Sequence, residues 1–247
     1  MHKFFVDESQ IEEMNIKIIN KDVKHIRDVL RLKLNSNIII SSNNINYLCE
    51  IMHIEKHEII SRIISKYEGI SEPEIEIILY QGLSKGSKMD LILQKGTEVG
   101  VKDFYPVATY RSIVKINELK KEQGKLDRWN LITEEAAKQS KRDYIPKVNG
   151  ILNFDDMIRL LETEENIIVP YENEDGLTIG QGLKQVTGNK IHLIIGPEGG
   201  FEEVEIEKLR GIGAKIVTLG NRILRTETAG FVASTIILYE LGNLGVI

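Results

Sequence analysis

The sequence predicts an α/β fold in which a parallel sheet carries helices on both faces, preceded by a small β-barrel. Up to about residue 68, short apolar runs alternate with polar turns, and beyond residue 74 apolar runs alternate with amphipathic helical segments. A polar stretch with a glycine and a proline, residues 68–74, separates the two patterns. We therefore expect two domains, a β-barrel over residues 1–70 and an α/β domain over residues 73–247.

The first region contains few strands. Strand-like runs occupy residues 3–6, 37–41, 45–54 and 58–67, and a single helical segment covers residues 22–33. Sheet edges expose unpaired backbone groups, and closure into a barrel removes them. A small barrel is therefore the expected form of this region.

The second region alternates strongly between strands and helices. This alternation favours a parallel sheet that is covered on both faces. The expected strands cover residues 74–82, 104–109, 166–171, 190–196 and 214–220, and the expected helices cover residues 88–101, 117–142, 154–162, 176–185, 203–212 and 227–241.

Composition limits the class of protein. The chain has 247 residues, of which 42% are hydrophobic and 28% charged, as in ordinary globular domains. No apolar run approaches the roughly 18 residues that span a bilayer, and the first residues lack the features of a secretory signal. We expect a cytoplasmic protein without a membrane partner. The single cysteine, Cys49, excludes an internal disulfide and a multi-cysteine zinc site, so no metal is expected and Cys49 is assigned to the core.

Charge is unevenly distributed along the chain. The formal net charge is −5, but residues 1–72 carry −1, residues 73–149 carry +3 and residues 150–247 carry −7. A polyanion is therefore expected to lie across the first two thirds. Scattered, solvated charge is the alternative interpretation.

The glycine turn "GPEGG", residues 196–200, lies between an expected strand and an expected helix. Such turns cradle ligands at the carboxyl edge of α/β sheets. The turn lacks the Lys-Ser/Thr of a phosphate-binding loop and the G-x-G-x-x-G spacing, and Glu202, Glu203 and Glu205 follow it. Because carboxylates repel a phosphate, a neutral or cationic ligand is favoured. Alone, the turn is weak evidence, since glycine turns are common in α/β proteins.

A second turn, "NRILR" at residues 221–225, again joins a strand to a helix. Thr226 or Thr228 is the natural N-cap, and Glu227 lies in the first helical turn. Apolar side chains in a polar loop beside Arg222 and Arg225 suggest an apolar wall and a cation that face a shared cleft. We favour a functional role for Arg225 over simple solvation.

Together, "LIIGPEGGF" and "LGNRILRTETA" resemble the signature of the SPOUT methyltransferases, and specifically of the RsmE family of 16S rRNA uridine N-3 methyltransferases. Three further motifs extend the resemblance over nearly the whole chain. They are "HIRDVLRLK" (residues 25–33), "KGSKMDLILQKGTEVGV" (residues 85–101) and "EEAAKQSKRDYIPKV" (residues 134–148).

From these motifs, the resemblance implies a PUA-like RNA-binding barrel and a SPOUT domain whose carboxyl-terminal part forms a trefoil knot. It implies S-adenosylmethionine as cofactor, a homodimer, and methylation at N-3 of a uridine, numbered 1498, in 16S rRNA or the 30S subunit. The final helix is apolar around most of its circumference, which fits either a dimer interface or a buried core helix.

The knot turns are the expected cofactor site. A sulfonium cation and an uncharged adenine tolerate nearby carboxylates, and Ile195, Leu219, Ile223 and Leu224 would form the wall around the ring. The expected cofactor-binding residues are Pro170, Tyr171, Ile195, Gly196, Pro197, Glu198, Gly199, Gly200, Leu219, Gly220, Asn221, Ile223, Leu224, Arg225, Thr226, Thr228 and Ala229.

Arg225 and Glu227 are the expected catalytic residues. Arg225 would stabilise negative charge on the uracil carbonyls. Glu227 would act as a base or orient Arg225, and stabilisation of the helix N-terminus is an equal alternative.

Cationic side chains from both domains are the expected RNA contacts. These are Lys3, His25, Arg27, Arg31, Lys85, Lys88, Lys95, Arg111, Lys138, Lys141 and Arg142. Two other functions remain open: a SPOUT enzyme with another target such as a ribose 2′-hydroxyl, and an RNA-binding ribosome-assembly factor without catalysis. The glycine spacing disfavours a nucleotide-dependent oxidoreductase.

Overall fold

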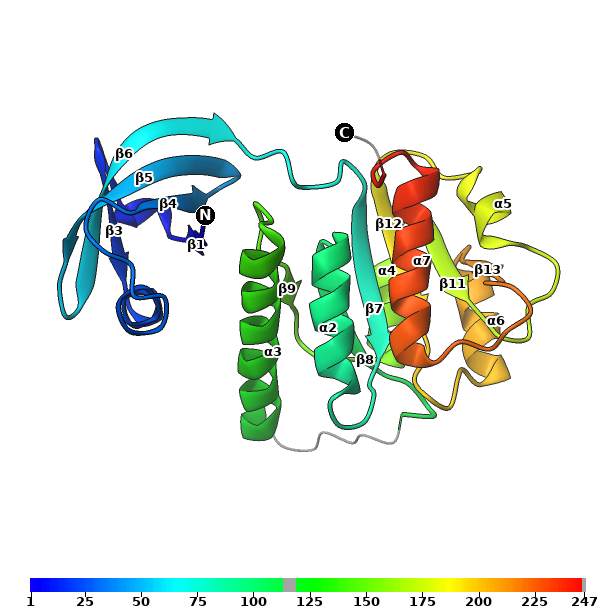
Figure 1. Cartoon of the computed structure of the whole chain (residues 1–247). Coiled ribbons are helices and arrows are strands. Elements are labelled where there is room, and N and C mark those ends of the chain that lie inside the picture. The colour runs from blue at the N-terminus through cyan, green and yellow to red at the C-terminus, as the bar shows by residue number, and fades with distance from the viewer. Residues whose placement is uncertain (113–118, 246–247) are drawn as a thin grey trace. The chain divides into compact units, whose positions relative to one another are not determined.

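The computed structural model describes residues 1–112 and 119–245. The chain folds into two compact units, shown in Figure 1. The first contains residues 1–72 and 137–145, and the second contains residues 73–136 and 146–247. Segment 137–145 was expected in the second domain, and the structure corrects this, because the segment packs with the first unit.

The first unit contains a six-stranded sheet in the order β1-β4-β5-β6-β3-β2. β1 pairs with β4 in parallel, and the other pairs are antiparallel. The four expected strands are confirmed. The elements are β1 (Lys3–Phe5), η1 (Glu8–Gln10), β2 (Ile11–Glu12), β3 (Asn15–Ile19), α1 (Lys21–Lys24), η2 (His25–Val29), β4 (Asn37–Ser42), β5 (Ile45–Ile54) and β6 (Glu58–Glu68).

Strand β3 was missed by the sequence analysis. Its signal is the alternation of Ile16 and Ile18, which are both buried, with exposed or half-buried neighbours. These two residues join Phe4, Ile40 and Cys49 in the single apolar core of this unit. Cys49 is fully buried, as predicted, and burial raises the pKa of its thiol to about 11.

A buried carboxylate fixes the segment 137–145 to the first unit. Asp143 is paired with Lys3, accepts a hydrogen bond from Asn46 Nδ2 at 2.6 Å, and accepts one from the Ser71 hydroxyl at 2.6 Å. Burial would raise the pKa of Asp143, but these partners outweigh it and hold the pKa at about 2. Removing one partner of such a buried pair strongly destabilises the fold, because the other charge is left buried and unpaired.

The second unit contains a parallel sheet in the order β10-β8-β7-β12-β11-β13, and β9 pairs with β8. The expected alternation of strands and helices is confirmed, with the addition of two short strands, β9 and β10, which were not expected. Residues 117–118 of the expected long helix lie outside the described residues. The elements are β7 (Glu76–Gly82), α2 (Lys88–Val99), β8 (Asp103–Ala108), α3 (Leu119–Ser140), β9 (Lys147–Val148), β10 (Leu152–Asn153), α4 (Phe154–Leu161), β11 (Ile167–Pro170), α5 (Ile179–Leu183), β12 (Lys190–Ile195), α6 (Glu203–Gly211), β13 (Lys215–Val217) and α7 (Thr226–Glu240).

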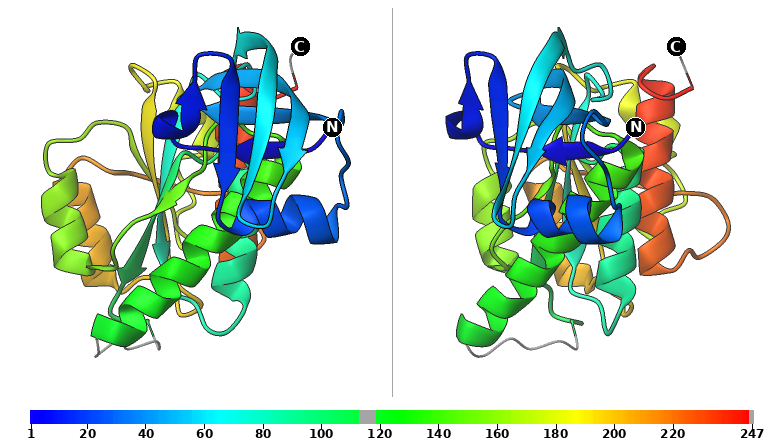
Figure 2. Two further views of the ribbon diagram at one scale, coloured as in Figure 1. Left: turned by 90° about the vertical axis from the view of Figure 1, so that its left-hand side faces the viewer. Right: turned by 60° about the vertical axis from the view of Figure 1, so that its left-hand side comes forward.

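Helices cover both faces of this sheet, as predicted (Figure 2). Side chains of one strand point alternately to the two faces. Ile77 and Leu79 of β7 therefore pack with α2, α5 and α7, whereas Ile78 and Tyr80 pack with α4 and α6. Two apolar cores result, one on each side.

The chain after β13 runs between two stretches of an earlier loop. The Tyr171 N–H donates to the carbonyl of Val217 at 2.9 Å, and the Thr218 N–H donates to the carbonyl of Leu177 at 2.8 Å. The Ile179 N–H donates back to the carbonyl of Thr218 at 3.2 Å. Residues 217–218 are thus bonded on one side to the start of loop 171–178 and on the other side to its end.

The final helix α7 is buried on one side only. Gly230, Ala233 and Ile237 are buried, whereas Phe231 is 41% and Tyr239 67% exposed. Of the two explanations for its apolar circumference, a core helix buried on all sides within the chain is therefore wrong, and the dimer interface stays a prediction. Among the described residues, no helix is long and apolar enough to cross a membrane.

Candidate functional site

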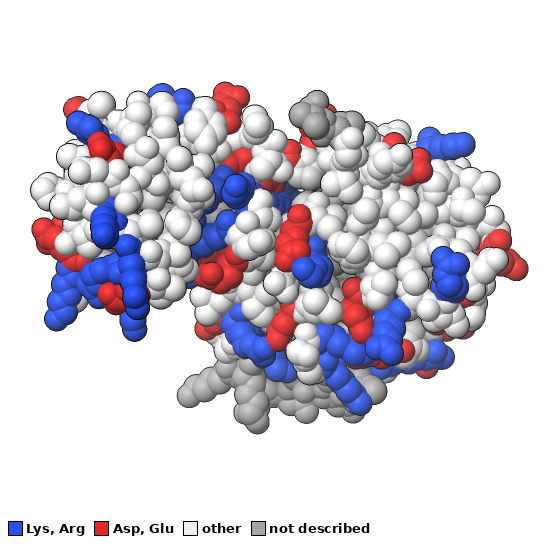
Figure 3. All heavy atoms as spheres, viewed as in Figure 1, with Lys and Arg blue, Asp and Glu red and all other residues white. Residues whose placement is uncertain are grey.

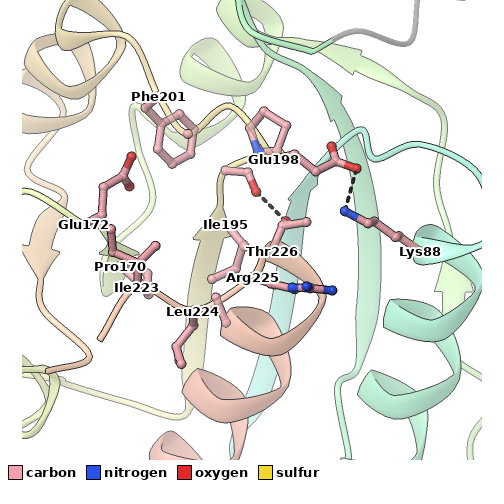
Figure 4. Close-up of a pocket in the computed structure, with 14 residues that line it drawn as sticks. Lys88, Pro170, Glu172, Ile195, Glu198, Phe201, Ile223, Leu224, Arg225 and Thr226 are labelled. Carbon is pink, nitrogen blue, oxygen red and sulfur yellow. Dashed lines mark hydrogen bonds and ion pairs between the residues drawn. The ribbon is translucent and has the colours of Figure 1, made fainter. Parts of the chain in front are cut away.

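The two glycine-containing turns of the second unit meet at the carboxyl edge of the sheet. The Thr226 hydroxyl, at the start of α7, donates to the carbonyl of Gly196 at 2.6 Å (Figure 4). The same hydroxyl accepts from the side-chain amide of Gln81 at 2.9 Å. Gln81 is fully buried at the end of β7. One hydroxyl therefore joins the ends of β7 and β12 to the beginning of α7.

Two glycines allow the first turn to take its shape. A Cβ on Gly82 would overlap the backbone nitrogen of Pro197, so β7 approaches the turn at backbone distance. Gly200 has a φ of 68°, a region that favours glycine. A Cβ at Gly200 would also overlap the carboxylate of Glu172. Close packing thus requires glycine at position 82, and backbone conformation favours it at position 200.

Arg111 fixes the outer side of the same turn. Its Nη1 donates to the carbonyl of Gly199 at 2.9 Å, and its Nε donates to Glu202 Oε1 at 2.9 Å. The bond to Glu202 raises the pKa of the Arg111 guanidinium. Glu205, which is fully buried, accepts from the N–H of Tyr110 at 3.0 Å and from the N–H of Glu202 at 2.8 Å. The acidic start of α6 therefore serves to hold the loop after β8 against the glycine turn.

Two adjoining cavities of about 290 and 250 Å³ lie beside the second turn. The larger lies between the two turns, and the smaller lies between the second turn and the loop after β11. They share the lining residues Pro170, Glu172, Ile223, Leu224 and Ala229. Fifteen of the seventeen expected cofactor residues line one or both cavities, namely Pro170, Tyr171, Ile195, Gly196, Pro197, Glu198, Gly200, Leu219, Gly220, Asn221, Ile223, Leu224, Arg225, Thr226 and Ala229.

Gly199 and Thr228 are not among the lining residues. The carbonyl of Gly199 is engaged by Arg111. Thr228 lies in the first turn of α7, where its N–H donates to the carbonyl of Arg225 at 2.8 Å. Neither bond involves the Gly199 N–H or the Thr228 hydroxyl, so both assignments stay predictions.

Three residues that line the larger cavity were not predicted as cofactor contacts: Lys88, Glu172 and Phe201. The smaller cavity adds Glu174, Asp175, Thr218 and Arg222. Glu172 directly follows the expected contacts Pro170 and Tyr171, so extending that stretch by one residue would have included it. Phe201 is 2% exposed and directly follows the glycine turn. Lys88 comes from α2, which is remote in sequence from both turns, and it was assigned to RNA.

Three charged residues that line the larger cavity, Lys88, Glu198 and Arg225, form a group with Glu227, which does not line it. The ammonium of Lys88 lies 3.2 Å from Glu198 Oε1 and 3.7 Å from Glu227 Oε2. Arg225 Nη1 lies 4.0 Å from Glu227 Oε1. Burial would raise the pKa of Glu198, but the bond from the Lys85 N–H, at 3.0 Å, and the charge of Lys88 bring it below its usual value. The Arg225 side chain is 83% exposed, so it can still reach a ligand.

Three of the expected RNA contacts are corrected by the structure. Lys3 is paired with Asp143, Lys138 with Asp22, and Arg142 with Glu72. The side chains of these three cations are at most 9% exposed. A cation buried in such a pair offers no surface to a phosphate.

The remaining cations differ in what they contact. Arg31, Lys85 and Lys141 are exposed. Arg27 is bonded to Asp28, and Lys95 lies 2.8 Å from Glu98. The ring of His25 packs edge-on against Phe4 at a centroid distance of 6.3 Å, so this histidine is partly structural. Lys88 and Arg111 belong to the cavity and the glycine turn, as described above.

Among the described residues, no group of three or more His, Cys, Asp or Glu side chains is placed to hold a metal ion. The polar atoms around the two cavities are carboxylates, lysine and arginine nitrogens, hydroxyls and backbone groups.

Comparison with known proteins agrees with this geometry. A family model described as an RNA methyltransferase domain matches residues 71–238, and one described as an RNA methyltransferase PUA domain matches residues 18–64. The chain is 32% identical over 249 residues to the ribosomal RNA small subunit methyltransferase E of Bacillus subtilis, covering 97% of both chains. The chain belongs to the ribosomal RNA small subunit methyltransferase E family. The protein of that family from Mesomycoplasma hyopneumoniae is 35% identical over 93% of this chain and 95% of its own.

Solved structures extend the likeness to the fold. A member of the family from Neisseria gonorrhoeae, crystallised with bound S-adenosyl methionine, superposes with a TM-score of 0.84 at 29% identity and covers 97% of both chains. A putative methyltransferase from Legionella pneumophila, also in complex with this cofactor, has a TM-score of 0.84 at 27% identity and covers 96% of both chains. A β-rich PUA domain and a SPOUT-like α/β domain are therefore confirmed. Closure of the first into a barrel stays a prediction.

Proposed function

We propose that this protein transfers the methyl group of S-adenosylmethionine to N-3 of a uridine in the RNA of the small ribosomal subunit. The observation that carries the proposal is the bond from Thr226 to Gly196, which brings the two turns together around the paired cavities. Full-length likeness to enzymes named for small-subunit RNA methylation supports the substrate class.

The cavities suit this cofactor, which would supply the methyl group. Ile195, Leu224 and Phe201 offer apolar walls for an adenine. Glu172, which lines both cavities, offers a negative charge to the sulfonium and amino groups. The carboxylates of this region would repel a nucleotide phosphate, so a cofactor without phosphate fits best.

The protein's own residues would position and activate the uridine. The N-3 proton must leave, and a bond forms between N-3 and the methyl carbon as the bond between that carbon and sulfur breaks. In this proposal Arg225 stabilises the negative charge that appears on the uracil carbonyls. Glu227 accepts the N-3 proton or orients Arg225, and its 4.0 Å separation from Arg225 fits the second role.

We further propose the trefoil knot and a division of labour between residues 1–70 and residues 73–247. The bonds of Val217 and Thr218 to both ends of loop 171–178 support a chain that threads through that loop.

The two segments would have different functions. Residues 1–70 would recognise RNA, and residues 73–247 would bind the cofactor. The family models, which match residues 18–64 and 71–238, support this division.

Exposed cations on each unit are the proposed RNA contacts. Figure 3 shows that Lys and Arg gather in groups on the face in view, including one over η2 and the β5–β6 hairpin. In the first unit, Arg27 reaches from η2 to the carbonyl of Lys56 in that hairpin at 3.1 Å. Arg31, Lys85, Lys95 and Lys141 complete the proposed set. Each phosphate contact should contribute roughly 0.7 to 0.9 to the slope of log affinity against log salt concentration.

A homodimer is proposed through the exposed side of α7. Phe231 and Tyr239 lie two turns apart on that side with Thr235 between them, and aromatic side chains are enriched at protein interfaces. Sedimentation of the purified protein would detect the dimer. A cytoplasmic location follows from the proposed ribosomal substrate.

One experiment tests the proposed function directly. Purified protein is incubated with methyl-labelled cofactor and either 16S rRNA or 30S particles, and the RNA is digested for nucleoside analysis by mass spectrometry. We expect label in 3-methyluridine. Label in a 2′-O-methyl nucleoside would assign another target, and the absence of both labelling and cofactor binding would favour an assembly factor.

A further inference from the structure

The larger cavity has a cation that neither turn supplies. Lys88 is the first residue of α2, the helix that follows β7. Its side chain lines the cavity together with Arg225 (Figure 4). The side chain is 35% exposed, so solvent or a ligand can reach it. Lys88 thus adds a third chain segment to the site.

Two carboxylates share this single ammonium. Glu198 Oε1 is 3.2 Å from Lys88 Nζ, and it also accepts the Lys85 N–H. Glu227 Oε2 is 3.7 Å away, which is too long for a hydrogen bond, and this buried oxygen has no hydrogen-bond partner among the described residues. An ammonium has three N–H donors, and the contact with Glu198 uses one of them. Lys88 can therefore still donate into the cavity.

Glu227 lies between two cations. Lys88 faces one of its oxygens, and Arg225 faces the other at 4.0 Å. A uracil that has lost its N-3 proton carries negative charge on two carbonyl oxygens, one on each side of N-3. Two cations, each beside a different oxygen of one carboxylate, match the two charges of that distribution.

We propose that Lys88 is a second catalytic cation, which donates to one uracil carbonyl while Arg225 contacts the other, so that the deprotonated imide is stabilised on both sides. This proposal rests on the proposed function, and it replaces the role of Lys88 as an RNA phosphate contact. The two carboxylates beside Lys88 disfavour a phosphate at this position.

The test compares Lys88→Met with Lys88→Arg by single-turnover kinetics at saturating cofactor and 30S particles. We expect the methionine variant to lose about 100-fold or more in rate, as when one donor to a developing anion is removed. The arginine variant, which keeps the charge, should retain most of the rate. Lys102→Met is the matched control, because Lys102 forms a similar ion pair with Glu76, at 3.6 Å, away from the cavity.

A more acidic uracil provides a readout that a structural role would not change. Particles that contain 5-fluorouridine have a more acidic imide, because fluorine withdraws electrons, and they need less stabilisation. The deficit of Lys88→Met should therefore shrink on these particles, whereas the unaltered protein should change little. Should the methionine variant unfold on thermal analysis, Lys88→Gln repeats the comparison with a polar side chain.

Three results would overturn the proposal. The first is an unchanged single-turnover rate with weaker, less salt-dependent particle binding, which indicates a phosphate contact. The second is a loss confined to cofactor affinity, and the third is an equal deficit on fluorinated and normal particles. The proposed function fails separately, if the unaltered protein makes no 3-methyluridine. If the unaltered protein makes 3-methyluridine and Lys88→Met is fully active, only the role of Lys88 is rejected.

Discussion

The two turns that form the site are held in opposite ways. The first, residues 196–200, is fixed mainly through its backbone: Gly82 packs directly against it, and Arg111 bonds the carbonyl of Gly199. The Lys85 N–H additionally bonds the side-chain carboxylate of Glu198. The second, residues 221–225, displays its side chains instead. Ile223 is 83% exposed, and the Arg225 side chain is equally exposed.

This difference separates binding from chemistry. A turn whose backbone is fixed before the ligand arrives loses little conformational entropy on binding, so it suits the invariant part of a cofactor. Side chains that project from a turn can adjust to a substrate. Substitutions at the first turn should therefore change cofactor affinity, and substitutions at the second should change the rate of methyl transfer.

The largest expected effect belongs to the second turn. Arg225→Ala should lower turnover by about 10² to 10³, which is the usual loss when a donor to a developing anion is removed. Cofactor affinity should stay within about threefold, because the exposed side chain contributes little to the shape of the cavity. Steady-state kinetics and calorimetry measure the two quantities. Arg159→Ala, on an exposed face of α4, is the control, and equal turnover in both variants would remove Arg225 from the mechanism.

The next effect tests the packing of the first turn. Gly82→Ala places a methyl group against the backbone of Pro197, and overpacking of this kind costs about 1 to 3 kcal/mol. If the added methyl group displaces the turn, so that this free energy is lost from cofactor binding, cofactor affinity should drop by roughly 5- to 150-fold. The control is Gly180→Ala in α5, where nothing lies within 4 Å of the added Cβ. Unchanged calorimetric affinity in Gly82→Ala would mean that the turn adapts freely.

Thr226 tests the bond that joins the two turns. Thr226→Val keeps the shape of the side chain but removes the donor to Gly196 and the acceptor for Gln81. Loss of these two hydrogen bonds should cost about 1 to 3 kcal/mol, with a corresponding loss of cofactor affinity. Thr226→Ser keeps the hydroxyl and should restore affinity. If the serine variant binds the cofactor as weakly as the valine variant, the hydroxyl is not what holds the two turns together.

Arg111 should give the smallest effect. Its pair with Glu202 is largely exposed, and exposed pairs contribute little because solvent and salt screen them. Arg111→Ala should therefore weaken cofactor binding by at most about fivefold. The difference in cofactor affinity between Arg111→Ala and the unaltered protein should become smaller at high salt, because salt screens the ion pair. A large loss that persists in high salt would show that Arg111 contacts a ligand.

The sequence predicted the local structure well and the long-range pairing poorly. Strand and helix alternation followed from the spacing of apolar residues, because that spacing is fixed by which face each element buries. Both turns were found from glycines and from Ile223 and Leu224 in a polar loop. The assignment of Lys3 to RNA was wrong, since its partner Asp143 lies 140 residues away and no local pattern reveals it.

Other departures have the same cause. Arg142 and Lys138 are neutralised by Glu72 and Asp22, carboxylates that the fold brings together with them. These contacts are made within the first unit, so they also explain why segment 137–145 leaves the domain to which its position in the chain assigned it. Lys88 was recognised as a functional cation, but its place beside the cavity depends on how α2 packs on the sheet.

The central claim is that the two turns together form a cofactor pocket that does not accept phosphate. Calorimetric titration of the purified protein with S-adenosylmethionine, alone and in the presence of excess ATP, tests it most directly. We expect saturable binding of the methyl donor that ATP neither reproduces nor weakens. Absence of methyl-donor binding, or competition by ATP at comparable concentration, would contradict the claim.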